Sequence, residues 1–106
     1  MKIFLDELKE TVKKLQDCNF QSEIFEILVN SLIEEDRLTI VCYIGAPSNY
    51  NYRERWLCQV VKKSSAANYH FTSHNILSDA DDEAFDSRED AFAAGLKYVF
   101  EMLEKR

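Results

Sequence analysis

The residue types best suited to a binding site are gathered between positions 48 and 56. The run Ser-Asn-Tyr-Asn-Tyr-Arg-Glu-Arg-Trp holds two Tyr, two Arg and one Trp. Tyr and Trp supply large contact areas at low entropic cost, and Arg pairs bidentately with carboxylates, so these types are enriched at protein interfaces. The alternative is that Trp56 and one Tyr belong to the core and the rest is an ordinary polar loop. The run predicts a protein-binding site made of Tyr50, Tyr52, Arg53, Arg55 and Trp56.

An acidic cluster lies further along the chain. Asp79, Asp81, Glu83, Ser87 and Asp90 place oxygen donors at several positions of a calcium-binding register. The sixth position holds alanine where the sharp turn needs glycine, and the last position holds Asp in place of a bidentate Glu. The interpretation that fits these departures is a solvated acidic loop that supplies carboxylates to the N-terminus of a following helix.

The two histidines are candidates for metal binding. His70 and His74 fall on one face of a predicted strand, with Cys58 on a neighbouring strand. Four strand positions span about 13 Å, so one ion cannot bridge both imidazoles in that arrangement. Zinc needs three or four converging ligands. Both histidines are therefore interpreted as strand residues, and no metal is expected.

Nucleophilic catalysis needs a nucleophile, a base and a shaped backbone around them. Cys18, Cys42 and Cys58 are widely spaced with no C-x-x-C pair, so they are interpreted as reduced thiols that pack as small hydrophobic residues. Only two Gly are present, which leaves no glycine run to cradle phosphate or shape an oxyanion hole. The chain is expected to be no enzyme and to use no cofactor; a small enzyme with a dispersed site remains an alternative.

Two N-terminal helices are the first elements expected to carry these residues. In the first helix the apolar stripe recurs at spacings of three and four, and the run Asp17-Cys18-Asn19 ends it. The second helix is predicted from Ser22, as N-cap, to the charged cluster at 34–37. Its wide apolar arc can bury within the chain or form a dimer seam. The expected stripe of the second helix is Ile24, Ile27, Leu28 and Leu32, with Glu23, Glu26 and Asn30 opposite.

Three strands are predicted in the middle of the chain, at 38–44, 55–63 and 69–76. The first strand is β-branched and aromatic and is apolar on both alternations, which predicts a central strand at least partly covered on both faces. The run Gly45-Ala46-Pro47-Ser48-Asn49 breaks it, and 64–68 resembles a hairpin connection. Short turns between consecutive strands favour a meander.

A C-terminal helix is predicted from Ser87, whose pairing with Asp90 resembles a capping box, to the end of the chain. Asp86 with Glu89 is an alternative start. Gly95 falls within the apolar arc, where it costs about 1 kcal/mol relative to Ala, so we expect the helix to approach the sheet closely there. The expected apolar stripe is Phe92, Leu96, Val99 and Leu103.

These elements predict one α+β domain over residues 1–106: two N-terminal helices, a three-stranded antiparallel meander and a C-terminal helix packed on the sheet. The longest uncharged apolar stretch, 38–46, is far shorter than the about 20 residues that a membrane span needs. Charged residues at 6, 7 and 9 interrupt any signal-peptide core. A cytoplasmic location without membrane contact is therefore expected.

The net charge of −6 is uneven: residues 1–37 carry −4, residues 38–77 carry +3 and residues 78–106 carry −5. The order helix, three strands, helix resembles the topology of double-stranded-RNA-binding domains, and 45–47 loosely matches their Gly-Pro loop. That resemblance implies phosphate-binding lysines at the start of the last helix, where this chain has Asp86-Ser87-Arg88-Glu89-Asp90 instead. Nucleic acid, double-stranded or stacked on sheet residues such as Tyr43, Tyr69 and Phe71, is the disfavoured alternative.

The expected function is protein binding without catalysis. The contact surface would be the Tyr/Arg run at 50–56 or an acidic helical face, so the partner is a protein and a basic one fits the charge. Small size, acidity and missing catalytic motifs are general features shared with inhibitor proteins of phages and mobile elements, although no motif assigns a family. A homodimer also remains open.

Overall fold

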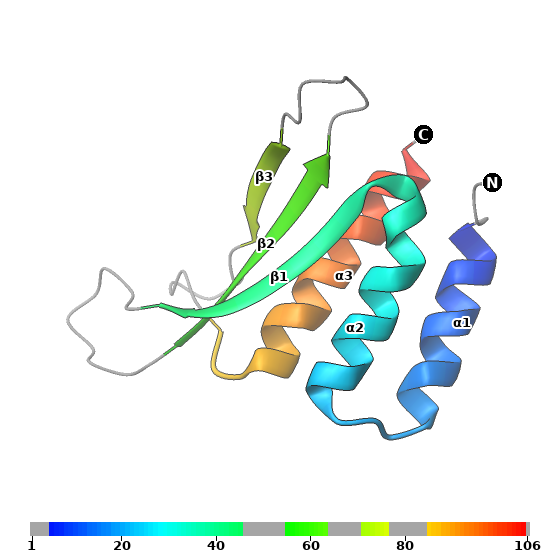
Figure 1. Ribbon diagram of the computed structural model, residues 1–106, viewed down its shortest axis with the longest axis horizontal. Helices are drawn as coiled ribbons and strands as arrows, with labels where there is room; N and C mark the ends of the chain where they lie inside the picture. The colour runs from blue at the N-terminus through cyan, green and yellow to red at the C-terminus, as the bar shows by residue number, and fades with distance from the viewer. Residues whose placement is uncertain (1–4, 46–54, 64–70, 77–84, 106) are drawn as a thin grey trace.

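The fold is a layer of helices on one side of an antiparallel sheet (Figure 1). The computed structural model describes residues 5–45, 55–63, 71–76 and 85–105. Among these residues, no helix has the length and apolar character that a membrane span requires. The α+β class and a C-terminal helix packed on an antiparallel sheet agree with the sequence prediction. The elements are α1 (Leu5–Asp17), α2 (Ser22–Ile33), η1 (Glu34–Asp36), β1 (Leu38–Gly45), β2 (Arg55–Lys63), β3 (Phe71–Ile76) and α3 (Arg88–Glu104).

β1 pairs with β2 in antiparallel fashion and lies at the edge of the sheet. Its register with β2 runs from Leu38 opposite Lys62 to Gly45 opposite Arg55. The Lys63 N–H donates to the Arg37 carbonyl at 2.9 Å, which makes the even-numbered positions of both strands the non-hydrogen-bonded pairs of the ladder.

The expectation that the first strand is covered on both faces is wrong for its outer positions. Leu38 and Ile40 are buried towards α3, but Val41 and Tyr43, on the other face, are each 39% exposed. The reason is the single helical layer: α2 and α3 pack on one side of the sheet, and α1 packs on those two helices (Figure 1). Apolar residues on both alternations therefore reflect an exposed apolar face here.

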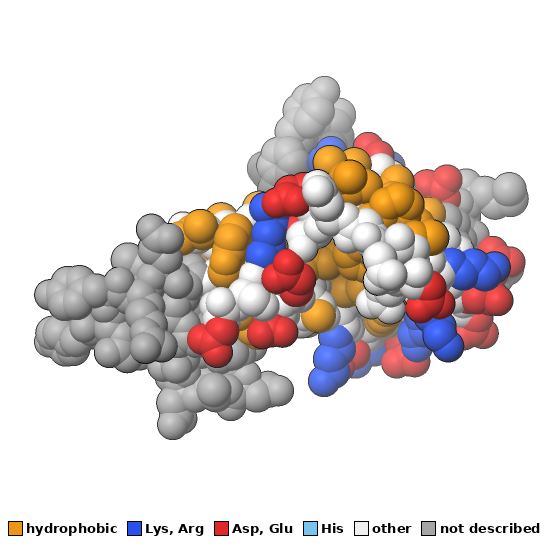
Figure 2. Space-filling view, turned by 90° about the horizontal axis from the view of Figure 1, so that it is seen from below, with side chains coloured by type: hydrophobic (Ala, Val, Ile, Leu, Met, Phe, Trp, Pro, Cys, Tyr) orange, Lys and Arg blue, Asp and Glu red, His pale blue; other side chains and the backbone are white. Residues whose placement is uncertain are grey.

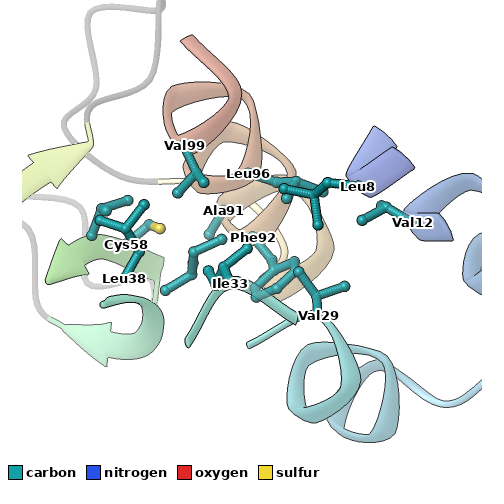
Figure 3. Close-up of a cluster of buried hydrophobic side chains, with 12 residues drawn as sticks. Leu8, Val12, Val29, Ile33, Leu38, Cys58, Ala91, Phe92, Leu96 and Val99 are labelled. Carbon is teal, nitrogen blue, oxygen red and sulfur yellow. The ribbon is translucent and has the colours of Figure 1, made fainter. Parts of the chain in front are cut away.

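The core forms where the stripe of α3 meets β1, β2 and the first two helices (Figure 3). Phe92, Leu96 and Val99 of the predicted stripe are buried, and Leu103 packs against the core. Gly95 is the point of closest approach, because a Cβ there would lie 2.6 Å from Cys58 Sγ and 2.8 Å from Ile40 Cγ2. The tight seat that Gly95 predicted is confirmed.

The two predicted helix caps have different outcomes. Ser87 caps α3, with its Oγ accepting a hydrogen bond from the Asp90 N–H at 3.1 Å, as predicted. Ser22 does not cap α2: the N-cap position is Gln21, and no side chain caps it. The Ser22 hydroxyl donates to the Glu89 carboxylate instead, which ties the start of α2 to the start of α3.

Helix α2 buries a different face from the one that the sequence predicted. Ile24 and Ile27, assigned to the buried stripe, are 44% and 65% exposed. Glu26, assigned to the solvated face, is 7% exposed, and Asn30 is half-buried. The buried residues of this helix are Glu26, Val29 and Ile33.

Candidate functional site

A groove of about 480 Å³ opens between α3 and the facing ends of α1 and α2. It lies at the end of the molecule where the chain turns from α1 into α2 and where α3 begins (Figure 1). Grooves with an apolar floor and a few polar groups are the usual sites of ligand and side-chain binding. The lining residues are Gln16, Ser22, Phe25, Glu26, Glu89, Asp90, Phe92, Ala93, Leu96, Lys97 and Phe100.

Aromatic and aliphatic side chains line the apolar part of the groove. Phe25 of α2 and Phe92 of α3 meet edge to face, with ring centroids 5.8 Å apart at 72°. Leu96 and Phe100 continue the apolar lining one and two turns further along α3. The edge-to-face contact holds the two rings in a fixed arrangement, so the apolar part is built before any ligand arrives.

The polar part of the groove is mainly acidic. Glu26, Glu89 and Asp90 contribute carboxylates and Lys97 contributes the one lysine of the lining. The hydrogen bond from the Ser22 hydroxyl, and then the backbone amide of Glu89 itself, lower the pKa of the Glu89 carboxyl. Glu89 is therefore ionised at neutral pH and presents a negative charge beside the apolar surface.

Arg88 links this groove to the sheet. Its Nε lies 2.6 Å from Glu26 Oε2, and its Nη1 lies 3.5 Å from Glu23 Oε1. The contact between Arg88 Nε and Glu26 Oε2 is short enough for a charge-assisted hydrogen bond, but its angles do not meet the requirements of one. It is therefore an ion pair, held by the attraction between the two charges. The guanidinium also lies over the indole of Trp56, 5.3 Å from the ring centroid. The adjacent carboxylate of Glu26 raises the pKa of Arg88, so the guanidinium stays charged.

Of the residues predicted to bind a partner, the structure places Trp56 next to this charged cluster. Its backbone exchanges two hydrogen bonds with Phe85, at 2.9 and 2.7 Å, and its half-buried ring packs against the core. Arg55 begins β2, and its side chain lies outside the described residues. Tyr50, Tyr52 and Arg53 also lie outside them. Trp56 thus packs against the core, as the alternative interpretation of the run expected, and it also contacts Arg88.

Large hydrophobic side chains are exposed in two groups near these elements. Phe20, Ile24 and Ile27 lie in and before α2, and Val41, Tyr43 and Ile44 lie on β1. Figure 2 shows the end of the molecule that carries the groove, with hydrophobic patches on either side of a strip of acidic and basic side chains. The described surface therefore alternates apolar and charged regions across α2, β1 and the start of α3.

The residues that were considered as metal ligands form no cluster in the described part of the chain. Within the described residues, no group of three or more His, Cys, Asp and Glu side chains could hold a metal ion. His70 and the acidic positions 79, 81 and 83 lie outside the described residues, and His74 pairs with Val60 in the register of β3 with β2.

Comparison with protein-family models, curated proteins and solved structures gives no match. Sequence reasoning missed the groove because its lining comes from three helices whose mutual packing no local pattern specifies. The one sequence signal for the groove was the high apolar content of α2. Apolar side chains on several sides of a helix need more than one neighbouring element to bury them.

Proposed function

We propose that this chain is a non-enzymatic protein-binding module that receives a basic, amphipathic segment of a partner protein in the groove between α2 and α3. The observation that carries the proposal is the combination of an apolar floor with a carboxylate rim. Interface anchors are large apolar side chains that fill such pockets, with charged groups around them that set orientation and specificity.

The charge of the rim selects the class of partner. Glu89 and Asp90 lie in the first turn of α3, and Glu23 lies in the first turn of α2. Glu23 and Glu26 are engaged by Arg88, whereas Glu89 and Asp90 are exposed at the mouth of the groove. A Lys or Arg next to an apolar anchor would place its stem on the aromatic floor and its charge at these carboxylates.

The Tyr/Arg run at 50–56 would make a second contact with the partner protein. Gly45 and Arg55 are register partners, so the chain leaves and re-enters the sheet beside the exposed Tyr43 and Ile44. Trp56, at the start of β2, reaches the groove through Arg88 and Glu26. We also propose that the three strands form one complete antiparallel meander. The chain would act as a small inhibitor that covers a basic surface of its partner.

A labelled amphipathic peptide of Leu and Lys tests the groove directly. We expect the full chain to bind it, with an affinity that falls as salt rises. Ala93 lines the groove and is exposed, so Ala93→Trp fills the site without entering the core. The expected result is a loss of affinity of roughly tenfold, measured by fluorescence anisotropy.

Glu101→Trp is the matched control, because it places the same indole on an exposed position of α3 outside the groove. It is expected to leave the affinity unchanged. Equal binding by wild type and Ala93→Trp would show that the groove is not the site. Equal binding of a Leu and Glu peptide would show that the acidic rim does not select a basic partner.

A further inference from the structure

Cys42 and Cys58 face each other directly across the β1–β2 pair. The hydrogen bond from the Lys63 N–H to the Arg37 carbonyl sets the phase of the ladder, and in that phase 42 and 58 form a non-hydrogen-bonded pair. Cα atoms in such pairs lie about 4.5 Å apart and the side chains approach closely. A disulfide needs a Cα separation of about 4.4–6.8 Å, so the backbone already has the required spacing.

The two side chains also share one face of the sheet. As directly opposed partners they both lie on the face that α3 covers, where Cys58 Sγ lies against Gly95. The interaction between the two thiols, together with burial, raises the pKa of Cys42, and the same interaction lowers the pKa of Cys58. The pair therefore shares its protons and does not behave as two independent thiols.

Access to the two thiols is unequal. Cys58 is 1% exposed, and its Sγ lies where a side chain at position 95 would have to go. Cys42 is half-buried and is the member that a small reagent can reach. Cys18 is exposed in the turn directly after α1, outside the sheet, so it provides an internal reference thiol.

We propose that Cys42 and Cys58 form a reversible dithiol–disulfide pair that a low-molecular-weight disulfide closes. The Cys42 thiolate attacks one sulfur of the reagent, whose S–S bond breaks and releases one thiolate. The Cys58 sulfur then attacks Cys42 Sγ, which forms the Cys42–Cys58 bond and releases the second thiolate. The protein loses two protons and two electrons, and the reagent is reduced to two thiols.

Closing this bond joins β1, which carries the exposed Tyr43 and Ile44, to β2. It encloses a loop of roughly 15 residues, for which the chain-entropy account predicts a rise in melting temperature of roughly 10 °C or more.

The test uses the folded full chain with oxidised glutathione, followed by mass mapping of the linked peptides. The Cys18→Ser variant serves as a second sample, since it removes links through the exposed thiol. The expected product is an intramolecular Cys42–Cys58 link that dithiothreitol reverses. The same chain in urea should give a mixture of links when all three cysteines are present.

Two results would overturn the proposal. One is glutathione attached at Cys42 or Cys18 with no Cys42–Cys58 link in the folded chain. The other is the same mixture of links in the folded and unfolded chain, which would show that the strand register does not direct the reaction.

Discussion

The side-chain amide of Asn30 pairs with both backbone groups of Ile40. Asn30 Nδ2 donates to the Ile40 carbonyl at 3.0 Å, and the Ile40 N–H donates to Asn30 Oδ1 at 2.8 Å. Ile40 forms a non-hydrogen-bonded pair with Val60, so these two groups point away from β2 towards the edge of the sheet. Asn30 thus substitutes for one residue of a neighbouring strand and blocks the edge at this position.

Asn30→Ala should destabilise the fold through this pairing. It leaves a part-buried N–H and a part-buried carbonyl without their partner, at a cost of about 2 kcal/mol in the free energy of unfolding. Urea denaturation measures the change. Ser31→Ala is the control, because its exposed hydroxyl donates only to the Ile27 carbonyl of the same helix, and it should cost less than about 0.5 kcal/mol. Equal effects of the two substitutions would contradict the edge-blocking role.

The contact between Asn30 and Ile40 helps to explain why the sequence predicted the buried face of α3 but not that of α2. In α3 the apolar residues form one clear stripe with charged residues opposite, so its buried face follows from periodicity. In α2 apolar residues occur nearly all round, and periodicity cannot choose between faces. The choice is made by Asn30 at the sheet edge and by Glu26 at Arg88, which are tertiary partners absent from the local pattern.

The candidate site was less predictable than the fold. The composition of the run at 50–56 indicated Trp56, but its contact with Arg88 depends on how α3 starts against β2. The groove depends on the Ser22–Glu89 hydrogen bond between two helices that lie far apart in the chain. Such contacts follow from the docking angles of helices, and single-sequence patterns carry little information on those angles.

Gly95→Ala should lower stability although Ala is the better helix former. The added Cβ would lie 2.6 Å from Cys58 Sγ and 2.8 Å from Ile40 Cγ2, so α3 must shift on the sheet. Overpacking of this kind costs about 1–3 kcal/mol, against a gain of about 1 kcal/mol from helix propensity. Thermal unfolding checks the sign. In a Cys58→Ala background part of the cost should disappear, and strictly additive effects would show that the sulfur is not the obstacle.

Arg88→Met alone should lower the free energy of unfolding more than the double substitution Arg88→Met and Glu26→Leu. The single substitution leaves the carboxylate of Glu26, which is 7% exposed, without its cation at 2.6 Å. Breaking such a pair costs several kcal/mol when fully buried, and about 1–3 kcal/mol here because Arg88 is 30% exposed. Replacing both members removes the unpaired charge. A double variant less stable than the single variant would contradict this account.

Ser22→Ala should raise the pKa of the Glu89 carboxyl towards its ordinary value. In the wild type the Ser22 hydroxyl bonds the ionised carboxylate and lowers that pKa. A lowered folded-state pKa stabilises the fold above the ordinary carboxyl range, and the contribution is lost as pH falls through the lowered value. NMR titration of the side-chain carboxyl measures the shift. An unchanged pKa in the variant would mean that the hydrogen bond is not formed in solution.

Tyr43→Ala separates the proposed protein-binding function from the nucleic-acid alternative. Tyr43 is 39% exposed on the face of the sheet opposite the helices, so its loss should change the free energy of unfolding by less than about 1 kcal/mol. With a net charge of −6, the chain should show no measurable binding to a single-stranded oligonucleotide even at low salt. Binding that weakens steeply with salt and is lost in Tyr43→Ala would instead favour base stacking on this face, because an exposed ring contributes to stacking without supporting the fold.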